Sequence, residues 1–261
     1  MMKPSRSFDR AANFYDQTRP LFEPLATQGI QAILDLAGPQ ARVLDVGTGT
    51  GRISIPLLER GMDLIGCDLS SKMMGRLKEK FPGARIVQAD ASRLPFPTGH
   101  FEVVLTVHVL HLIPAWREAL REFKRVLVPG GSYINVKTWE SVGISIRGQL
   151  REYWRSWLGE RGVDAHLTGV RSNEEARPEL QLLGARLTEM EVVRYPLPFT
   201  LREQLEHFAS RTFSDAWEIP DAIFDASLEA LRTWVDHEYG DLDQPRTDEV
   251  RCVIDVARFD G

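Results

Sequence analysis

The sequence predicts an α/β fold built on a mostly parallel β-sheet. From about residue 42 to residue 138, short apolar segments typical of strands alternate with segments whose apolar residues recur at helical spacing. The first strand, 42–46, runs into a glycine-rich stretch at 47–51, and the second, 63–67, ends at Asp68. Strands and helices that alternate at these lengths form parallel βαβ units with right-handed crossovers.

Composition sets the class of protein. The 261 residues are 43% hydrophobic and 26% charged, which suits one globular domain, 1–261, with a large core. A net charge of −5 argues against nucleic-acid binding, which needs a basic face. Cys67 and Cys252 lie in apolar segments without metal-ligand spacing, so we expect buried thiols and no metal. With no apolar leader and no membrane-spanning run, we expect a cytoplasmic protein.

The first half of the chain supplies most of the expected sheet. Residues 9–37 look helical, with breaks at Pro20 and Pro24. A helix is expected from about Gly51 to Arg60, where Pro56 is tolerable only in the first turn. The further expected elements are a helix capped by Ser70 and ending at 80, strands at 84–88, 101–106 and 132–137, and a helix at 116–127.

Beyond residue 138 the alternation is interrupted twice. Helices are expected at 146–158, 173–183, 201–210 and 220–239, and strands at 186–194 and 251–259, of which the last should be antiparallel. We therefore expect a core made of about 26–138, 171–196 and 249–261, and a cap made of about 1–25, 139–170 and 197–248.

The glycine-rich stretch after the first strand has the features of a nucleotide-type site. Glycines allow backbone angles closed to other residues and let a ligand approach the main chain, and the following helix presents free N–H groups. Asp68 follows Gly47 at nearly the 20-residue spacing that places a carboxylate on ribose hydroxyls. Arg52 stands where a dinucleotide fingerprint would have its third glycine, which argues against a pyrophosphate there.

Four stretches together resemble the class I S-adenosylmethionine-dependent methyltransferases of type 11, the ubiquinone-biosynthesis-like group. The pattern Asp45-x-Gly47-x-Gly49-x-Gly51 resembles motif I of that family. The stretches at 15–20, 90–96 and 125–131 resemble its Tyr-Asp-x-x-Arg-Pro, D-A-x-x-L-P-F and R-V-L-x-P-G-G sequences. The resemblance covers about residues 10–138. It implies a Rossmann-like sheet of seven strands in the order 3-2-1-4-5-7-6 with one antiparallel strand, plus a helical cap.

The resemblance also implies a cofactor, S-adenosyl-L-methionine, with S-adenosyl-L-homocysteine as product. The glycine loop would hold its amino-acid part, Asp68 its ribose and Asp90 its adenine, while Tyr15 and Arg19 would fold over the cleft. The residues expected to bind the cofactor are Asp45, Gly47, Thr48, Gly49, Gly51, Asp68, Leu69, Met73, Asp90, Ala91, Thr106, Val107, Tyr15 and Arg19.

Candidate catalytic and substrate residues lie further along. His108 and His111 follow the strand 101–106, at the edge where such sheets bind ligands, and a histidine near neutral pKa suits proton abstraction. The alternative is that they only line the cleft, since methyl transfer needs little beyond alignment. His207, Phe208 and Arg211 are candidate substrate contacts among the later aromatic residues, although those rings could instead pack the cap helices.

Three functions compete. The first is in-line methyl transfer to a small, partly apolar organic substrate. The second is a non-catalytic cofactor-binding module or partner subunit of the same fold. The third is an NAD-dependent oxidoreductase, which Arg52 and the lack of a Tyr-x-x-x-Lys motif disfavour.

Overall fold

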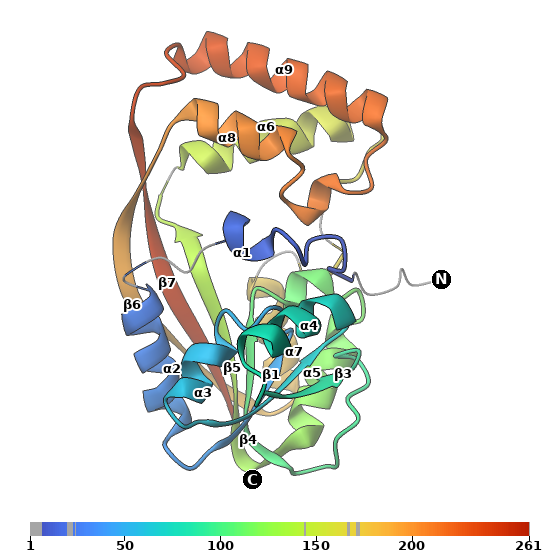
Figure 1. Ribbon diagram of the computed structural model, residues 1–261, viewed down its shortest axis with the longest axis vertical. Coiled ribbons are helices and arrows are strands. Elements are labelled where there is room, and N and C mark those ends of the chain that lie inside the picture. Colours follow the sequence, from blue (N-terminus) through green and yellow to red (C-terminus); the bar gives the residue numbers. More distant parts are fainter. Residues whose placement is uncertain are drawn as a thin grey trace. The chain divides into compact units, whose positions relative to one another are not determined.

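The computed structural model describes residues 7–19, 23, 25–143, 145–165, 168–170 and 173–260. These ranges contain a seven-stranded sheet in the order β3-β2-β1-β4-β5-β7-β6, as the resemblance implied (Figure 1). The strands are β1 Arg42–Val46, β2 Asp63–Asp68, β3 Arg85–Gln88, β4 Phe101–Val107, β5 Leu127–Ser141, β6 Ala185–Phe199 and β7 Arg246–Phe259.

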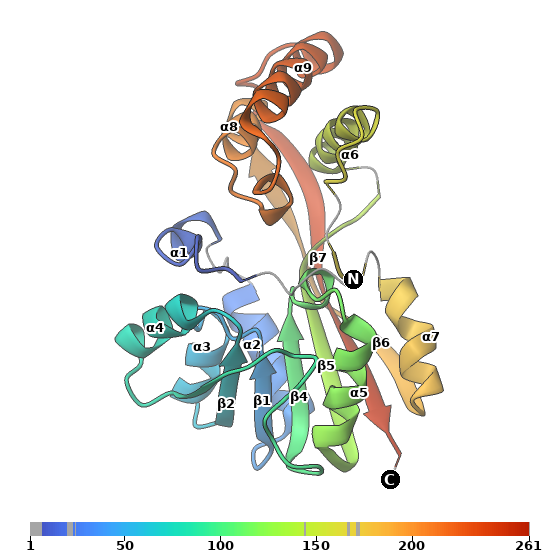
Figure 2. The same ribbon diagram turned by 90° about the vertical axis from the view of Figure 1, so that its right-hand side faces the viewer.

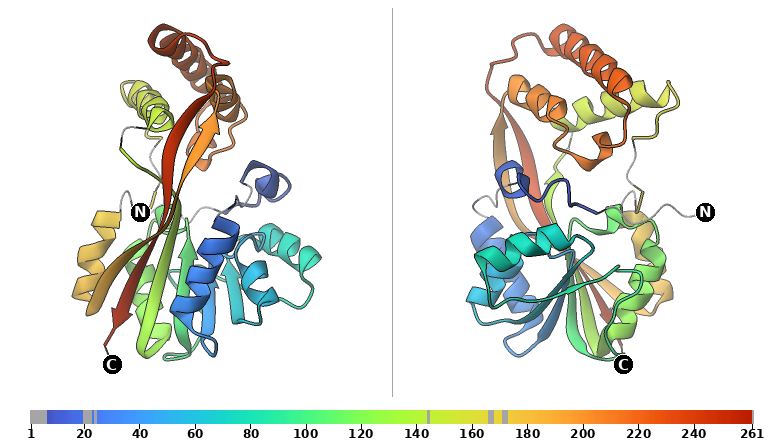
Figure 3. Two further views of the ribbon diagram at one scale, coloured as in Figure 1. Left: turned by 90° about the vertical axis from the view of Figure 1, so that its left-hand side faces the viewer. Right: turned by 45° about the vertical axis from the view of Figure 1, so that its right-hand side comes forward.

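The sheet is mostly parallel. β1 pairs in parallel with β2 and β4, β2 with β3, and β4 with β5. β7 points in the direction opposite to β6 (Figure 3). The carboxyl ends of the parallel strands therefore meet at one edge of the sheet, where ligands bind in open α/β folds.

Helices lie close to their predicted positions. They are α1 Tyr15–Thr18, the π-helix η1 Leu25–Gly29, α2 Ile30–Ala37, α3 Ser54–Glu59, α4 Ser71–Lys80, the 3-10 helix η2 Leu110–Leu112, α5 Trp116–Val126, α6 Ile146–Gly159, α7 Asn173–Leu182, α8 Leu201–Ala209, the 3-10 helix η3 Ser214–Ala216 and α9 Asp221–Tyr239. The breaks predicted at Pro20 and Pro24 fall outside the described residues.

Several predicted boundaries were wrong. α3 begins at Ser54 and not at Gly51, because Gly51 has a left-handed φ of 84°, and Pro56 consequently falls in the first turn. β5 begins at Leu127 and not at the predicted Ser132. The glycine-containing stretch before Ser132 belongs to the strand, and the pairing of β5 with β4 shifts in register there. β6 and β7 also extend beyond the predicted 186–194 and 251–259.

The chain divides into two compact units. Unit 1 consists of Met1–Thr138, Thr168–Val193 and Cys252–Gly261, and unit 2 of Trp139–Leu167 and Arg194–Arg251. In unit 1, α2 and α3 cover one face of the sheet, and α5 and α7 cover the other (Figure 2). Each face buries its own cluster: Ile33 and Leu57 pack against Val43 on the first, and Trp116 and Phe123 against Leu44 on the second. Burial on both faces explains the apolar runs 43–44 of β1 and 103–105 of β4.

Unit 2 has a hydrophobic core of its own. α6, α8 and α9 contribute Trp154, Phe208 and Leu231 to it, together with Phe199 at the end of β6. The indole N–H of buried Trp154 donates to the hydroxyl of Ser227 at 2.8 Å, so this aromatic ring leaves no polar atom unsatisfied. No helix in the described ranges is long and apolar enough to cross a membrane.

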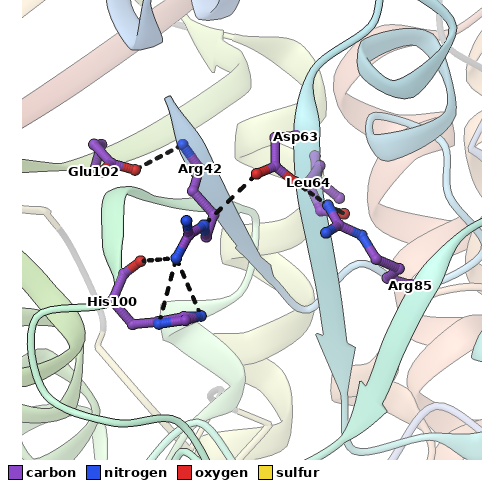
Figure 4. A network of polar contacts seen from close by, with 6 residues as sticks. All are labelled: Arg42, Asp63, Leu64, Arg85, His100 and Glu102. Atoms are coloured by element: carbon purple, nitrogen blue, oxygen red, sulfur yellow. Dashed lines mark hydrogen bonds and ion pairs between the residues drawn. The ribbon is translucent and has the colours of Figure 1, made fainter. Parts of the chain in front are cut away.

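A polar network joins the amino ends of four strands of unit 1 (Figure 4). The backbone N–H of Arg42 donates to Glu102 at 2.7 Å, and its guanidinium donates to the carbonyl of His100 at 3.3 Å. Asp63 forms ion pairs with Arg42 at 3.6 Å and with Arg85. The network lies at the edge opposite the carboxyl ends. Each of its partly exposed ion pairs contributes little to the free energy of unfolding.

Candidate functional site

A cavity that is open to solvent lies in unit 1 at the carboxyl ends of β1 to β4, and its volume, counted together with its open mouth, is about 670 Å³. It brings together these residues predicted from sequence: Tyr15, Gly47, Gly49, Asp68, Leu69, Met73, Asp90, Ala91, Val107 and His108.

The glycine loop forms the wall that follows β1. Gly47 and Gly49 have φ values of 77° and 57°, which residues with a side chain rarely adopt. The backbone N–H groups of Gly47 and Thr48 donate to the carbonyl of Cys67 at 2.8 and 3.1 Å, so the loop is tied to β2. Gly51 has another role, because a Cβ there would come within 2.9 Å of Leu77 and Ile55. It allows α4 to pack closely and does not line the cavity.

A buried polar chain supports the loop from below. Asp45 is 2% exposed and accepts a hydrogen bond from the hydroxyl of Ser54, which also contacts the hydroxyl of Thr48. Burial raises the pKa of Asp45 to about 6, against the opposing effect of these hydroxyls. Asp45 and Thr48 therefore hold the loop in shape but do not line the cavity.

Asp68 joins the loop to the next helix. One carboxylate oxygen accepts from the N–H of Gly49 at 2.9 Å, and the other accepts from the N–H of Ser70 at 2.8 Å. Burial raises the pKa of Asp68, and the backbone donors act in the opposite direction. Each oxygen can accept a further hydrogen bond, so the carboxylate can receive ligand hydroxyls. Ser70, as predicted, caps α4 by accepting from Met73 at 3.1 Å.

The loop after β3 carries Asp90 and is held from behind by α5. Asp90 accepts from the N–H and hydroxyl of Ser92 at 2.9 and 2.7 Å, which fixes its side chain. Arg125 donates to the carbonyls of Leu94 and Phe96 at 3.0 and 2.8 Å and pairs with Glu122 at 2.7 Å. The arginine of the 125–131 stretch therefore supports the wall that contains Asp90 and Ala91.

The N-terminal segment 7–19 supplies another wall. Phe8 and Tyr15 line the cavity with ring centroids 6.2 Å apart, and the guanidinium of Arg19 lies 4.8 Å from the Tyr15 ring. Arg19 itself is not among the lining residues. Side chains anchor the segment to the loop and to α4: Asp9 to Ser70 at 2.5 Å, Asn13 to Arg76 at 2.6 Å, and Asp16 to Thr50 at 2.5 Å and Lys80 at 3.0 Å.

The two candidate catalytic histidines lie after β4, with ring centroids 6.5 Å apart. His108 lines the cavity, whereas His111, in η2, does not. Nε2 of His108 lies 3.2 Å from the backbone nitrogen and 2.5 Å from the hydroxyl of Thr138, at the end of β5. Burial, followed by the positive charges of His111, Arg52 and Arg19, lowers the pKa of His108 to about 3.

Some predicted residues lie elsewhere. Thr106 is buried, and its hydroxyl bonds to Tyr133 at 2.8 Å and Asn135 at 3.0 Å, away from the cavity lining. In unit 2, His207 is exposed and Phe208 packs against Trp154 in the core. Arg211 pairs with Asp221 at 2.7 Å and lies over Phe224. The side chains of Thr106 and Arg211 therefore have structural partners in their own units.

Several residues that line the cavity were not predicted from the sequence: Phe8, Val46, Cys67, Ala89, Val109, Leu112 and Ile113. Val46, Cys67 and Ala89 directly precede the predicted residues Gly47, Asp68 and Asp90, so adjacency at a strand end could have indicated them. Phe8 carries no local signal. In the described residues no group of three or more metal-ligating side chains gathers that could hold a metal ion.

Comparison with known proteins gives a consistent result. Residues 44–135 match the family described as "Methyltransferase domain". The chain is 36% identical over 131 residues to a demethylmenaquinone methyltransferase of Beutenbergia cavernae, a match over 49% of this chain and 54% of the relative. It is 28% identical to a malonyl-[acyl-carrier protein] O-methyltransferase of Enterobacter lignolyticus, over 63% and 67% of the two chains. The chain thus spans about half the length of the first of these relatives.

The fold is also found among solved structures. The YcgJ protein of Bacillus subtilis superposes with a TM-score of 0.60 at 18% identity, over 89% of this chain and 98% of that one. At this identity the likeness shows the shared fold alone.

Proposed function

We infer that this chain, which belongs to the class I S-adenosylmethionine-dependent methyltransferases, moves a methyl group from that cofactor to a small organic acceptor. One observation supports this most directly. A single cavity in unit 1 is lined by the left-handed glycines 47 and 49, by Asp68 after β2 and by Asp90 after β3. These groups stand at the carboxyl ends of three adjacent parallel strands.

The residues present fit the cofactor. Glycines at 47 and 49 leave the backbone accessible, and a Cβ at Gly49 would be in contact with Met73. The fixed carboxylate of Asp68 is suited to the ribose hydroxyls, and Asp90 to an exocyclic amine. Leu69, Met73, Ala91 and Val107 offer apolar surface to a base.

When bound, S-adenosylmethionine supplies a methyl group on a sulfonium, whose departure leaves a neutral thioether. The protein's own part is therefore alignment and the exclusion of water. Asp68 and the loop fix one end of the cavity, and the anchored segment 7–19 covers it with Phe8 and Tyr15. The methyl acceptor would bind at the part of the cavity that follows β4, next to His108.

The acceptor is proposed to be a small molecule. The relatives named above act on a demethylmenaquinone and on a malonyl group carried by a protein. Both names describe organic acceptors, not nucleic acids, in keeping with the net charge of −5. We propose that unit 2, whose segments carry none of the cofactor motifs, determines which acceptor is used.

Calorimetric titration tests the proposal. S-adenosylhomocysteine should bind to the wild-type chain, whereas NAD should not, and binding of NAD instead would favour the oxidoreductase alternative. A methyl-transfer assay over a panel of quinols, carboxylates and amines then separates an enzyme from a non-catalytic module. Binding of S-adenosylhomocysteine without transfer to any member of the panel would favour the module.

A further inference from the structure

We infer that His108 is a positioning residue, held neutral with its proton on Nδ1, that ties the end of β4 to the end of β5 and does not act as the general base. The inference rests on the proposed methyl transfer and assigns one residue of that site. All the groups involved belong to unit 1.

The hydrogen-bond partners of the ring decide its protonation. The backbone N–H of Thr138 points at Nε2 of His108 from 3.2 Å. A backbone N–H can only donate, so Nε2 must be the accepting nitrogen, and the neutral ring carries its proton on Nδ1. The Thr138 hydroxyl, 2.5 Å from the same nitrogen, adds a second polar contact. If His108 acted as a base and took a proton on Nε2, that proton would point at the Thr138 N–H. The hydrogen bond from Thr138 to His108 would then be lost.

The backbone at His108 shows why such a tie is useful. His108 has a φ of 55°, in the left-handed region that few residues other than glycine occupy. This turn takes the chain out of β4 and into the segment whose Val109, Leu112 and Ile113 line the cavity. Val109 packs so closely on the loop that a Cβ at Gly47 would lie 2.3 Å from it. A fixed His108 therefore fixes the part of the cavity wall that follows β4.

The electrostatic surroundings agree with a neutral ring. In the part of the chain that the structure describes, the groups that act on His108 include Thr138 on β5, His111 in η2, Arg52 in the stretch between the glycine loop and α3, and Arg19 after α1. Burial and the three basic groups all oppose protonation, which places the pKa at about 3. A general base works best with a pKa near the working pH, so His108 is poorly suited to that task.

Nuclear magnetic resonance of the full chain, labelled with ¹⁵N at histidine, tests the protonation directly. Spectra recorded from pH 5 to pH 8 should show one ring in the Nδ1–H form that does not titrate, and this signal should vanish in His108→Asn. A His108 ring in the Nε2–H form, or one that titrates with a midpoint near 6.5, would overturn the inference. Neither result depends on whether the chain transfers methyl groups.

Two variants test the positioning role, with S-adenosylhomocysteine as the probe. His108→Ala removes the acceptor for Thr138 and should weaken binding about tenfold, the equivalent of one hydrogen bond. His108→Asn tolerates the left-handed backbone and offers a carbonyl to the Thr138 N–H, so it should restore most of the affinity. The ratio of the His108→Ala and wild-type dissociation constants should stay constant from pH 5 to pH 8.

The outcomes are distinct. Equal affinities of wild type and His108→Ala, or a ratio that changes around pH 6.5, would refute the positioning role. Should His108→Ala fail to fold, His108→Asn and the spectra of the wild-type chain still decide the matter. If the wild-type chain does not bind S-adenosylhomocysteine at all, the proposed function fails, whereas the tautomer of His108 is still read from the spectra.

Discussion

At the scale of single residues, Asp68 both joins the glycine loop to α4 and presents a carboxylate to the cavity. Its two oxygens accept from the backbone of Gly49 in the glycine loop and of Ser70 at the start of α4. The carboxylate is thus oriented before any ligand arrives, which reduces the entropy lost on binding. The remaining lone pairs are the ones we assign to ribose hydroxyls.

Asp68→Ala should weaken the binding of S-adenosylhomocysteine by about 1.5–3 kcal/mol, because a charged acceptor is lost. Titration calorimetry measures the change. Asp63→Ala is a matched control, since Asp63 begins the same strand, is exposed and lies at the opposite edge. An unchanged dissociation constant in Asp68→Ala would remove Asp68 from the ribose site, and an equal loss in Asp63→Ala would point to general damage.

Asp45 gives a prediction about pH. Its pKa of about 6 in the folded chain lies above the ordinary value, so the folded state holds this proton more tightly than the unfolded state. Between about pH 4 and pH 6 its contribution to the free energy of unfolding should therefore fall as the pH rises, by on the order of 3 kcal/mol, and be flat above.

Urea unfolding of the full chain at pH 4.5 and pH 7.5 checks this. Asp45→Asn cannot titrate, so its loss of stability over this interval should be smaller than that of the wild-type chain. The exposed Asp35→Asn should keep the wild-type slope. An identical slope in all three chains would show that Asp45 ionises in the folded state at its ordinary pKa.

At the scale of elements, the site residues at the ends of strands were easier to predict from the sequence than those inside a strand or near the N-terminus. The glycine loop and Asp68 could be predicted because the loop follows one short apolar strand and Asp68 ends the next, whereas Asp90 was expected from the resemblance of residues 90–96 to the family's D-A-x-x-L-P-F sequence. The role of Thr106 was harder to predict, because neighbouring residues of a strand face opposite sides. Val107 lines the cavity, while Thr106 turns to Tyr133. Phe8 reaches the cavity through anchors distant in sequence, such as Asp9 to Ser70, which no local pattern contains.

The start of α6 in unit 2 depends on a residue a hundred positions away. Buried Asp248 accepts from Ser145 at 2.7 Å, from the N–H of Ile146 at 3.0 Å and from the Arg147 side chain at 2.8 Å. Burial acts to raise the pKa of Asp248, but these donors outweigh it, so the pKa is lowered. A negative charge at a helix N-terminus is also favourable.

Asp248→Asn should lower the free energy of opening of α6 by about 2–3 kcal/mol at pH 7, since charged hydrogen bonds are lost. Hydrogen exchange of the amides in α6 measures it. Because the folded pKa is lowered, the contribution is complete above about pH 4 and is lost as the pH falls below that value. Asp243→Asn, in an exposed pair with Arg202, should leave the exchange of α6 unchanged.

At the scale of the whole molecule, two units share one sheet. β5, β6 and β7 each begin or end in unit 1 and continue into unit 2. The cofactor motifs all belong to unit 1, whereas the core of unit 2 is built from Trp154, Phe208 and their neighbours. This separation is the basis of the proposal that unit 1 binds the cofactor and unit 2 determines which acceptor is used.

Hydrogen exchange with and without S-adenosylhomocysteine tests that division. Saturating ligand should protect the glycine loop, the first turn of α4 and the segment 7–19, because binding stabilises the folded state by mass action. Protection that extends to the region around Phe208 would support the cap expected from the sequence. Protection confined to the glycine loop, Asp68 and Asp90 would contradict a covering role for residues 7–19, and unit 2 would then be a better candidate for a partner-binding surface.

The position of β7 also has a consequence for synthesis of the chain. β7 lies between β5 and β6, yet it is made after both, about a hundred residues later than the end of β5. On the ribosome, β6 has no neighbouring strand to join when it emerges, and the edge of β5 stays unpaired until residues 246–259 arrive. An exposed edge of this kind is a template for aggregation. The nascent chain is therefore most vulnerable shortly before its last strand appears, and a truncation before residue 246 should yield an aggregating product.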